Sequence, residues 1–305
     1  MRLHAVLCVL ATASPLRASF VQLATRSTAS AARRHACHPV CVAAAVETSG
    51  ATGEEDAWLQ GTAALAAEVL PSGSAGESVL SELRAAAAAE LRALHFPARK
   101  DEAWRRTDIS LLRASRMVAP AAAEEAAAAV VAEYADESST GMRLVLVDGV
   151  CSASLSDLSD LPAEVSVGGL LHGGAGADGE QRALSALRGA LPEAGADHRT
   201  ALGCHVFAAL NQASLADVAA IAVPDGVAVP RPLHVLSVST GVPVAGGTEG
   251  GEGGEGGSDL AVSHPSVVIA LGAGAQLHVL QQYAGVGAYF TNAITRVAIG
   301  EGGTV

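Results

Sequence analysis

The pattern that most constrains the fold of this chain begins at Ala219 and continues to the last residue. Short apolar runs rich in β-branched side chains alternate there with turns that contain Pro or Gly, and no helical period is present. The runs cover residues 221–223, 227–229, 233–238, 267–271, 276–283 and 289–299. Runs of this length between turn residues are typical of strands, and Pro230 and Pro232 exclude a helix because proline has no amide hydrogen to donate. We therefore predict that the last third folds as β-structure.

Helical spacing is found in the earlier part of the chain. Five apolar side chains fall on one stripe and predict a helix over residues 77–95 that ends before Pro97. They are Leu80, Leu83, Ala87, Leu91 and Leu94. Further helices are predicted over 121–134, 181–191 and 202–213, and a strand is predicted over 143–147 with a turn at Asp148 and Gly149. The expected fold class is mixed α/β, with helices first and strands last.

The first 46 residues have the composition of a targeting leader. They contain no Asp or Glu but five Arg, and an apolar run from Ala5 to Ala13 precedes a Ser-, Thr- and Ala-rich stretch after Phe20. A signal-like run followed by a transit-like one is typical of proteins sent to the plastid (chloroplast) stroma, including that of secondary plastids, and a mitochondrial presequence is the alternative. We expect residues 1–46 to be a bipartite, disordered plastid targeting leader.

Three further segments are expected after the leader. Residues 47–140 are predicted to form a helical N-terminal domain, and residues 141–200 a connecting segment with a strand, a turn and helices. Residues 201–305 are predicted to form an incomplete β core. Within this core, residues 245–258 repeat Glu-Gly-Gly, which predicts a disordered, solvated insertion between two strands.

Several function classes are disfavoured by composition and motif. A net charge of −12 argues against nucleic-acid binding, and a phosphate-binding loop ending in Gly-Lys is excluded because Lys100 is the only lysine. Gly272 and Gly274 follow an apolar run but lack the third glycine and the helix of a dinucleotide site, so we predict a β-turn. Every long apolar run is interrupted before about 18 residues, and no membrane-spanning helix is expected.

Metal and histidine sites are not expected either. One cluster has a spacing that could hold Zn²⁺ or Fe, but it lies in the predicted leader: His35, Cys37, His38 and Cys41. Cys151 and Cys204 remain after the leader and indicate small buried hydrophobes in a reduced compartment. His234 and His278 lie in predicted strands and could face one shared surface, with a satisfied or solvent-facing histidine as the default interpretation.

A charged stretch between the first two predicted helices carries a resemblance. Residues 96–108 read Phe-Pro-Ala-Arg-Lys-Asp-Glu-Ala-Trp-Arg-Arg-Thr-Asp, which on composition alone indicates a solvated loop with one anchoring aromatic. The stretch resembles the signature Phe-Pro-x-Arg-Lys-x-Glu-x-Trp-(Lys/Arg)-Tyr-Thr-Asp of SufD proteins, in the SufB/SufD family of the SUF iron–sulfur cluster assembly complex. Eight residues match the signature, and the resemblance implies for them either a structural role or a role in interaction. They are Phe96, Pro97, Arg99, Lys100, Glu102, Trp104, Thr107 and Asp108. Arg106 stands where the family usually has an aromatic residue.

Further blocks resemble the same family in the same order. They cover residues 144–149, 154–158, 161–162, 207–213, 221–227, 231–236, 263–283 and 289–293. The resemblance implies a right-handed parallel β-helix behind a helical N-terminal domain. It also implies a non-catalytic scaffold subunit that pairs with SufB and the SufC ATPase. An iron–sulfur cluster would then be present transiently in the complex, with no cofactor bound by this chain alone and no nucleic-acid or membrane partner.

Two alternatives remain open from the sequence. The chain ends several turns of the implied β-helix before the family's late histidine and its C-terminal helices, so a truncated or degenerate SufD paralogue without complex formation is one alternative. For the same reason no catalytic residue is assigned. A β-helix carbohydrate-active enzyme is the other, although neither an Asp cluster with Arg or Lys nor a six-residue repeat is visible.

Overall fold

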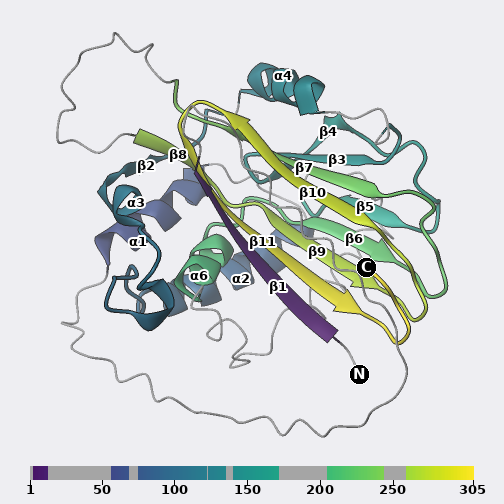
Figure 1. The fold of residues 1–305 in the computed structure, drawn as a ribbon, viewed down its shortest axis with the longest axis horizontal. Helices are drawn as coiled ribbons and strands as arrows, with labels where there is room; N and C mark the ends of the chain where they lie inside the picture. Colours follow the sequence, from purple (N-terminus) through teal and green to yellow (C-terminus); the bar gives the residue numbers. More distant parts are fainter. Residues whose placement is uncertain are drawn as a thin grey trace, which may run out of the picture. The chain divides into compact units, whose positions relative to one another are not determined.

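Two sheets account for the strands of the described chain, and both contain parallel neighbours (Figure 1). The computed structural model describes residues 3–12, 56–68, 75–121, 123–134, 140–171, 205–243 and 259–305. The strands are β1 (Leu3–Thr12), β2 (Arg116–Val118), β3 (Arg143–Val147), β4 (Val150–Asp157), β5 (Ser166–Gly169), β6 (Ala219–Val223), β7 (Leu233–Thr240), β8 (Asp259–Ser263), β9 (Ser266–Leu271), β10 (Val279–Val286) and β11 (Tyr289–Ile299). The larger sheet has the order β2-β8-β11-β9-β6-β5, with β1 also paired to β11, and the smaller has the order β10-β7-β3-β4.

The later strands stack in parallel with a constant offset. Ser266 of β9 pairs with Ile294 of β11, and Ala261 of β8 pairs with Tyr289, so each position meets the one 28 residues further on. In the smaller sheet β10 lies parallel to β7 along its whole length. The chain therefore passes repeatedly from one sheet to the other, with β6, β8, β9 and β11 in the larger sheet and β7 and β10 in the smaller.

Glycines at positive φ allow the turns at one end of the strands to stack. Gly226, Gly274 and Gly302 have φ of 70°, 66° and 70°. The amide of Gly226 donates to the carbonyl of Ala273, and the amide of Gly274 donates to that of Glu301. Residues with a Cβ rarely adopt this conformation, so these glycines allow each turn to bond to the next.

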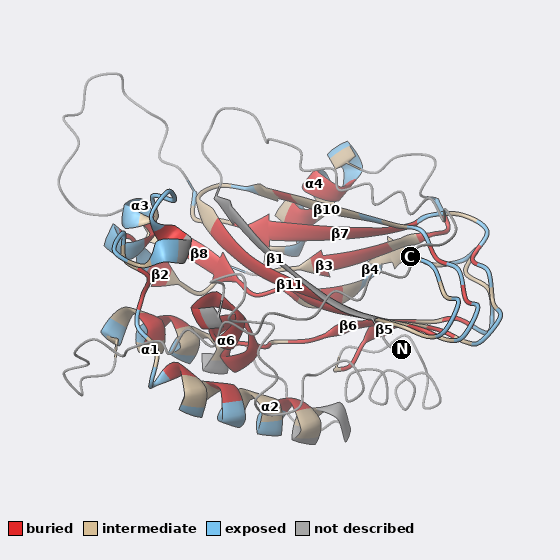
Figure 2. Cartoon of the chain, turned by 60° about the horizontal axis from the view of Figure 1, so that its bottom comes forward, coloured by how far each residue is buried: buried red, intermediate tan, exposed pale blue. Residues whose placement is uncertain are grey.

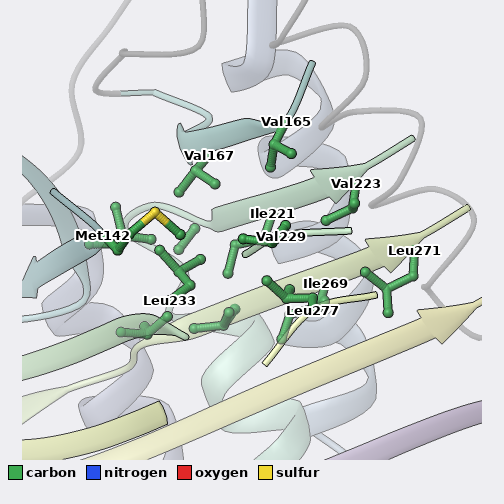
Figure 3. Packing of buried hydrophobic residues seen from close by; sticks show 14 of the residues in the cluster. Met142, Val165, Val167, Ile221, Val223, Val229, Leu233, Ile269, Leu271 and Leu277 are labelled. Carbon is green, nitrogen blue, oxygen red and sulfur yellow. The ribbon is translucent and has the colours of Figure 1, made fainter. Parts of the chain in front are cut away.

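Small aliphatic side chains fill the space between the sheets. Leu233 of β7, Ile221 of β6 and Ile269 of β9 point toward one another in Figure 3, together with Val167 and Leu277. All are at most 4% exposed. The low aromatic content of the chain suits this interior, because branched aliphatic residues alternate along strands that face each other.

Helices cover the outer faces of both sheets. They are α1 (Ala57–Ala64), α2 (Ala75–Leu91), α3 (Ser110–Ala114), α4 (Glu124–Tyr134) and α6 (His205–Ala213), with the 3₁₀ turns η1 (Leu65–Glu68) and η2 (Glu102–Trp104). Ala127, Val130 and Val131 of α4 pack against Leu236 and Val238 of β7. Leu80 of α2 packs against the outer face of β6 and β9, and Figure 2 shows β7 and the middle of β11 as buried.

Most predicted elements are present, several with different bounds. The strands over 143–147 and 289–299 are confirmed at their bounds. The helix over 77–95 ends at Leu91, because the next residues form tighter turns and the amide of Phe96 bonds to Asp56 instead. The helix predicted over 121–134 begins at Glu124, and that over 202–213 is observed as α6.

Two strand predictions were wrong in position. The strand predicted over 276–283 begins only at Val279 and continues to Val286. Gln276, before it, makes isolated bridges to Ala228 and Thr304. The run 227–229 is not a strand but contributes that single bridge at Ala228, because Pro230 and Pro232 follow at once. The predicted turns at Asp148 and at Gly272–Gly274 are confirmed.

Other predictions fall outside the described residues. These are the helix over 181–191, the insertion over 245–258 and the leader beyond β1. β1 lies within the predicted leader and pairs antiparallel with β11. The targeting role of residues 1–46 and the division into domains stay predictions. No helix in the described ranges is both long enough and apolar enough to cross a bilayer.

Candidate functional site

The signature segment, residues 96–108, forms a series of tight turns between α2 and α3. The amide of Asp101 donates to the carbonyl of Ala98, that of Trp104 to Asp101, and that of Thr107 to Trp104. The Asp101 carboxylate also accepts the amide of Ala98 at 2.8 Å. The local hydrogen bonds therefore hold the loop in one shape while its side chains point to different sides.

Aromatic rings join this segment to the helices and to the larger sheet. The Phe96 ring lies 4.8 Å from Trp58 of α1 and 6.0 Å from Phe207 of α6. Phe207 also contacts Trp104 at 5.3 Å and Phe290 of β11 at 6.3 Å. Five of the six Phe and Trp residues of this aromatic-poor chain thus meet at one junction. Edge and tilted ring pairs stabilise by about 0.5–1.5 kcal/mol beyond their burial, so the junction concentrates packing energy.

Asp56 connects the same junction through its carboxylate. It is the N-cap of α1 and accepts the amides of Trp58 and Leu59, and its other oxygen accepts the amide of Phe96 at 3.0 Å. Arg113 of α3 donates to it at 2.6 Å, while the guanidinium carbon lies 5.2 Å from the Phe96 ring centre. One carboxylate therefore fixes the start of α1, the start of the signature segment and α3.

The electrostatics of Asp56 favour its charged form. Burial opposes ionisation, but the hydrogen bonds from Arg113 and from the amides of Phe96 and Leu59 outweigh it and lower the pKa of Asp56 below its ordinary value. The carboxylate is charged at neutral pH and holds Arg113 in place. Asp56 was missed at the sequence level, although an Asp directly before an apolar run is a recognised N-cap signal.

The remaining signature residues face solvent. Phe96, Pro97 and Trp104 are buried, whereas the charged residues and Thr107 are exposed: Arg99, Lys100, Glu102, Thr107 and Asp108. Around them lies an open groove of about 260 Å³, lined by Phe96, Pro97, Arg99, Thr107, Asp108, Ile109, Ser110 and Arg113. The signature is therefore divided between an anchoring half and a surface half. Arg106 is exposed and adds nothing to the aromatic junction.

A second cluster lies where α6 meets the turn between β8 and β9. Asn211 of α6 donates to the carbonyls of Pro265 and Asn292 at 3.1 and 2.7 Å. Asn292 of β11 donates to the carbonyl of Phe207 at 2.9 Å, and its amide nitrogen lies 3.3 Å from Nδ1 of His264. The amide, imidazole and backbone groups bond to each other, which ties the helix to both strands.

His264 is held neutral in this cluster. Burial lowers the pKa of its imidazole to about 3. Because the amide nitrogen of Asn292 is a donor, Nδ1 of His264 accepts and the ring proton resides on Nε2. A cavity of about 30 Å³ beside it, lined also by Asp148 and Ser214, has room for about one water molecule. The cluster is thus structural in character and too confined for a substrate.

The other candidate groups remain separate in the structure. Cys151 is buried, and burial with the nearby Asp217 carboxylate raises the pKa of its thiol well above the ordinary value. His234 is buried beside Gln282 while His278 is exposed, so the two histidines do not share an exposed surface. Within the described ranges no three His, Cys, Asp or Glu residues gather in a metal-binding arrangement, and His35, Cys37, His38, Cys41 and Cys204 lie outside those ranges.

The structure brings together blocks that are distant in the sequence. Phe96, Phe207 and Phe290 belong to three of the blocks that carried the resemblance, and Asn211, His264 and Asn292 also come from three blocks. The partners are between 28 and 111 residues apart: Asn292 is 28 residues from His264, and Phe207 is 111 from Phe96. No local pattern in the sequence predicts these contacts.

Comparison with known proteins finds one distant relative. No protein-family model matches the chain. An iron–sulfur cluster assembly SufBD family protein from Synechocystis is 24% identical over 239 residues, which cover 75% of this chain and 47% of the relative. The chain therefore spans about half the length of the curated relative that it matches. This distant homology supports a place in the SufB/SufD family and does not separate SufD from SufB.

Proposed function

We propose that this chain is a SufD-type scaffold subunit of iron–sulfur cluster assembly, which pairs with SufB and the SufC ATPase and carries no catalytic residue of its own. The observation that carries the proposal is the homology to the SufBD family protein over three quarters of the chain. The segment at residues 96–108 favours SufD over SufB, because it is the part of the chain that resembles SufD alone.

The parallel strands support a β-helix as the scaffold. Strands β9 and β11 repeat with an offset of 28 residues, and the turns at Gly226, Gly274 and Gly302 stack on each other. A stack of this kind buries its strands inside and presents long outer faces to partners. In such a complex the nascent cluster is cargo held between subunits. We place the complex in the plastid stroma on the composition of residues 1–46, with the mitochondrion as the alternative.

Co-purification tests the scaffold role. The full-length transcript product, tagged and expressed in the source organism, is expected to bring SufB and SufC with it from a plastid fraction in fixed ratio. The variant Phe207→Ala removes the ring at the centre of the aromatic junction and is expected to reduce recovery of both partners, and circular dichroism of the variant separates loss of binding from loss of folding.

A cluster-transfer assay provides the functional readout. A SufB–SufC preparation with this chain is expected to transfer iron and sulfide to an apo-ferredoxin faster than the same preparation without it. Folded, monodisperse protein that recovers neither SufB nor SufC would refute the scaffold role and favour a degenerate paralogue. Cleavage of acidic polysaccharides by the purified chain would instead favour a carbohydrate-active enzyme.

A further inference from the structure

We propose that the groove beside the signature segment is a docking site for a partner protein, and that it takes a short acidic peptide with one apolar anchor residue. The groove of about 260 Å³ lies between the signature turns and α3. The proposal goes beyond the scaffold function, because it concerns a site on the helical side of the chain and specifies the chemistry of its occupant.

The shape of the groove suits a peptide side chain. Phe96, Pro97 and Ile109 supply apolar lining, while Thr107 and Ser110 supply hydroxyl and backbone groups at its margin. Phe96 is held by the aromatic junction and by the Asp56 contact, and Pro97 follows it directly. The site is thus preformed, and binding requires little ordering of the protein.

The helix that borders the groove also carries an exposed leucine. Leu111 is 69% exposed, more than any other large apolar side chain in the described ranges. It belongs to α3, whose Ser110 and Arg113 line the groove and whose residues are largely exposed in Figure 2. A partner that binds here can bury its anchor residue against the apolar lining of the groove and can also cover the exposed leucine.

Charge around the groove selects an acidic occupant. Residues 99–116 carry six cationic side chains and three acidic ones, and Asp56 and Asp259 pair with two of the cations, Arg113 and Arg116, in a chain whose net charge is −12. The cations are Arg99, Lys100, Arg105, Arg106, Arg113 and Arg116. This segment is therefore weakly cationic in an acidic chain, which favours a ligand that carries a carboxylate.

Arg99 is the cation best placed to bind the incoming carboxylate. Its guanidinium lies 3.9 Å from Asp108, with side chains 79% and 63% exposed. An ion pair this open is worth about 0–1 kcal/mol, so a ligand carboxylate can replace Asp108. Arg113 is already held by Asp56 at 2.6 Å, so it lines the groove in a fixed position.

A nucleic acid fits the same groove less well. The exposed carboxylates of Glu102 and Asp108 lie among the cations, and a polyanion would also meet the negative charge of the whole chain. A short peptide with few charges avoids both penalties. We therefore assign the site to a protein segment.

Selection from a random library of 12-residue displayed peptides on the full chain tests the proposal. Enriched sequences are expected to place Asp or Glu within a few positions of Leu, Ile, Phe or Met. The double variant Arg99→Ser with Leu111→Ser is expected to bind the best peptide about tenfold more weakly or worse. The matched control Arg105→Ser removes a cation that pairs with Glu102 outside the groove lining, and it is expected to keep the affinity.

Five outcomes would overturn the assignment. Peptides without acidic residues, or no enrichment at all, would contradict the charge argument. Equal affinity in the double variant would place the binding site elsewhere. Concentration-dependent self-association abolished by Leu111→Ser would identify a second copy of the chain as occupant, and binding of a labelled oligothymidylate abolished by Arg99→Ser would identify nucleic acid. Circular dichroism of every variant confirms folding, and none of these readouts depends on SufB or SufC.

Discussion

Acidification should destabilise the protein through His264. In the folded state its ring is buried against Asn292 and its pKa is about 3, compared with 6.5 for a free imidazole. Below pH 6.5 the unfolded chain therefore binds a proton that the folded chain does not bind. Stability falls as pH falls through this window and is restored as pH rises above it, because protons bind preferentially to the unfolded state.

The size of the effect follows from the two pKa values. Between about pH 7.5 and about pH 5 the unfolded imidazole becomes protonated while the folded one stays neutral. The lower pH lies about 1.5 pH units below the ordinary pKa of histidine, and each unit lowers the free energy of unfolding by about 1.4 kcal/mol. The total loss is therefore about 2 kcal/mol. Asp148 works in the opposite direction, because burial raises its pKa despite hydrogen bonds from Thr240. Its contribution is common to wild type and variant and cancels in their difference.

Urea unfolding at the two pH values measures this quantity, followed by far-ultraviolet circular dichroism. The informative variant is His264→Asn, which retains an acceptor near the position of Nδ1 and cannot titrate. The stability difference between wild type and variant is expected to change by about 2 kcal/mol between the two pH values. His278→Asn, at an exposed position, is the matched control and is expected to follow the wild type. A difference that stays constant with pH would show that His264 is not held neutral by burial, and the reasoning would fail.

Three further substitutions test the packing, capping and turn arguments, each by urea unfolding at neutral pH. Phe207→Ala is expected to cost about 3–5 kcal/mol because it removes the ring that contacts three others, and a loss below 1 kcal/mol would contradict the junction. Asp56→Ala is expected to cost about 1–2 kcal/mol through loss of the α1 cap and an unpaired Phe96 amide. Gly274→Ala, at φ 66° in open space, is expected to cost about 1–2 kcal/mol from backbone conformation alone. Gly61→Ala inside α1 is also in open space and is expected to stabilise by about 0.8–1 kcal/mol, so equal effects of the two would refute the turn argument.

Strands rich in apolar and β-branched residues could be predicted from the sequence. β3 and β11 match their predicted bounds, since both are bounded by turn residues and neither contains Pro. β4 was missed because its Ser-rich sequence has little apolar signal, although it pairs antiparallel with β3. β8 was missed because five residues directly after the Gly-rich repeat give no period that can be measured. Tertiary pairing defines these two strands.

The candidate site was predictable only in part. The signature residues were identified as a group, and Trp104 was expected to anchor the loop, which its burial confirms. Their division into buried and exposed halves depends on Phe207 and Phe290, which are distant in the sequence. The role of Asp56 depends on Arg113 and on the amide of Phe96. Such contacts arise from the path of the chain through space and leave no spacing that a sequence pattern could show.

The connections between the stacked parallel strands differ in length, and this has a practical consequence for engineering. Eighteen residues separate β7 from β8, whereas two residues separate β10 from β11. Even so, β7 pairs in parallel with β10, and β8 pairs in parallel with β11. The parallel pairing of the strands therefore tolerates a long connection between β7 and β8. In general, each doubling of the length of a flexible loop costs only about 0.6 kcal/mol. A fluorescent domain, an affinity tag or a biotin acceptor peptide can accordingly be inserted between Pro243 and Asp259, beyond the backbone bonds of Gly241 and Val242 to Val286 and Ala288. The chain could then be immobilised or imaged through this connection, with both termini left native.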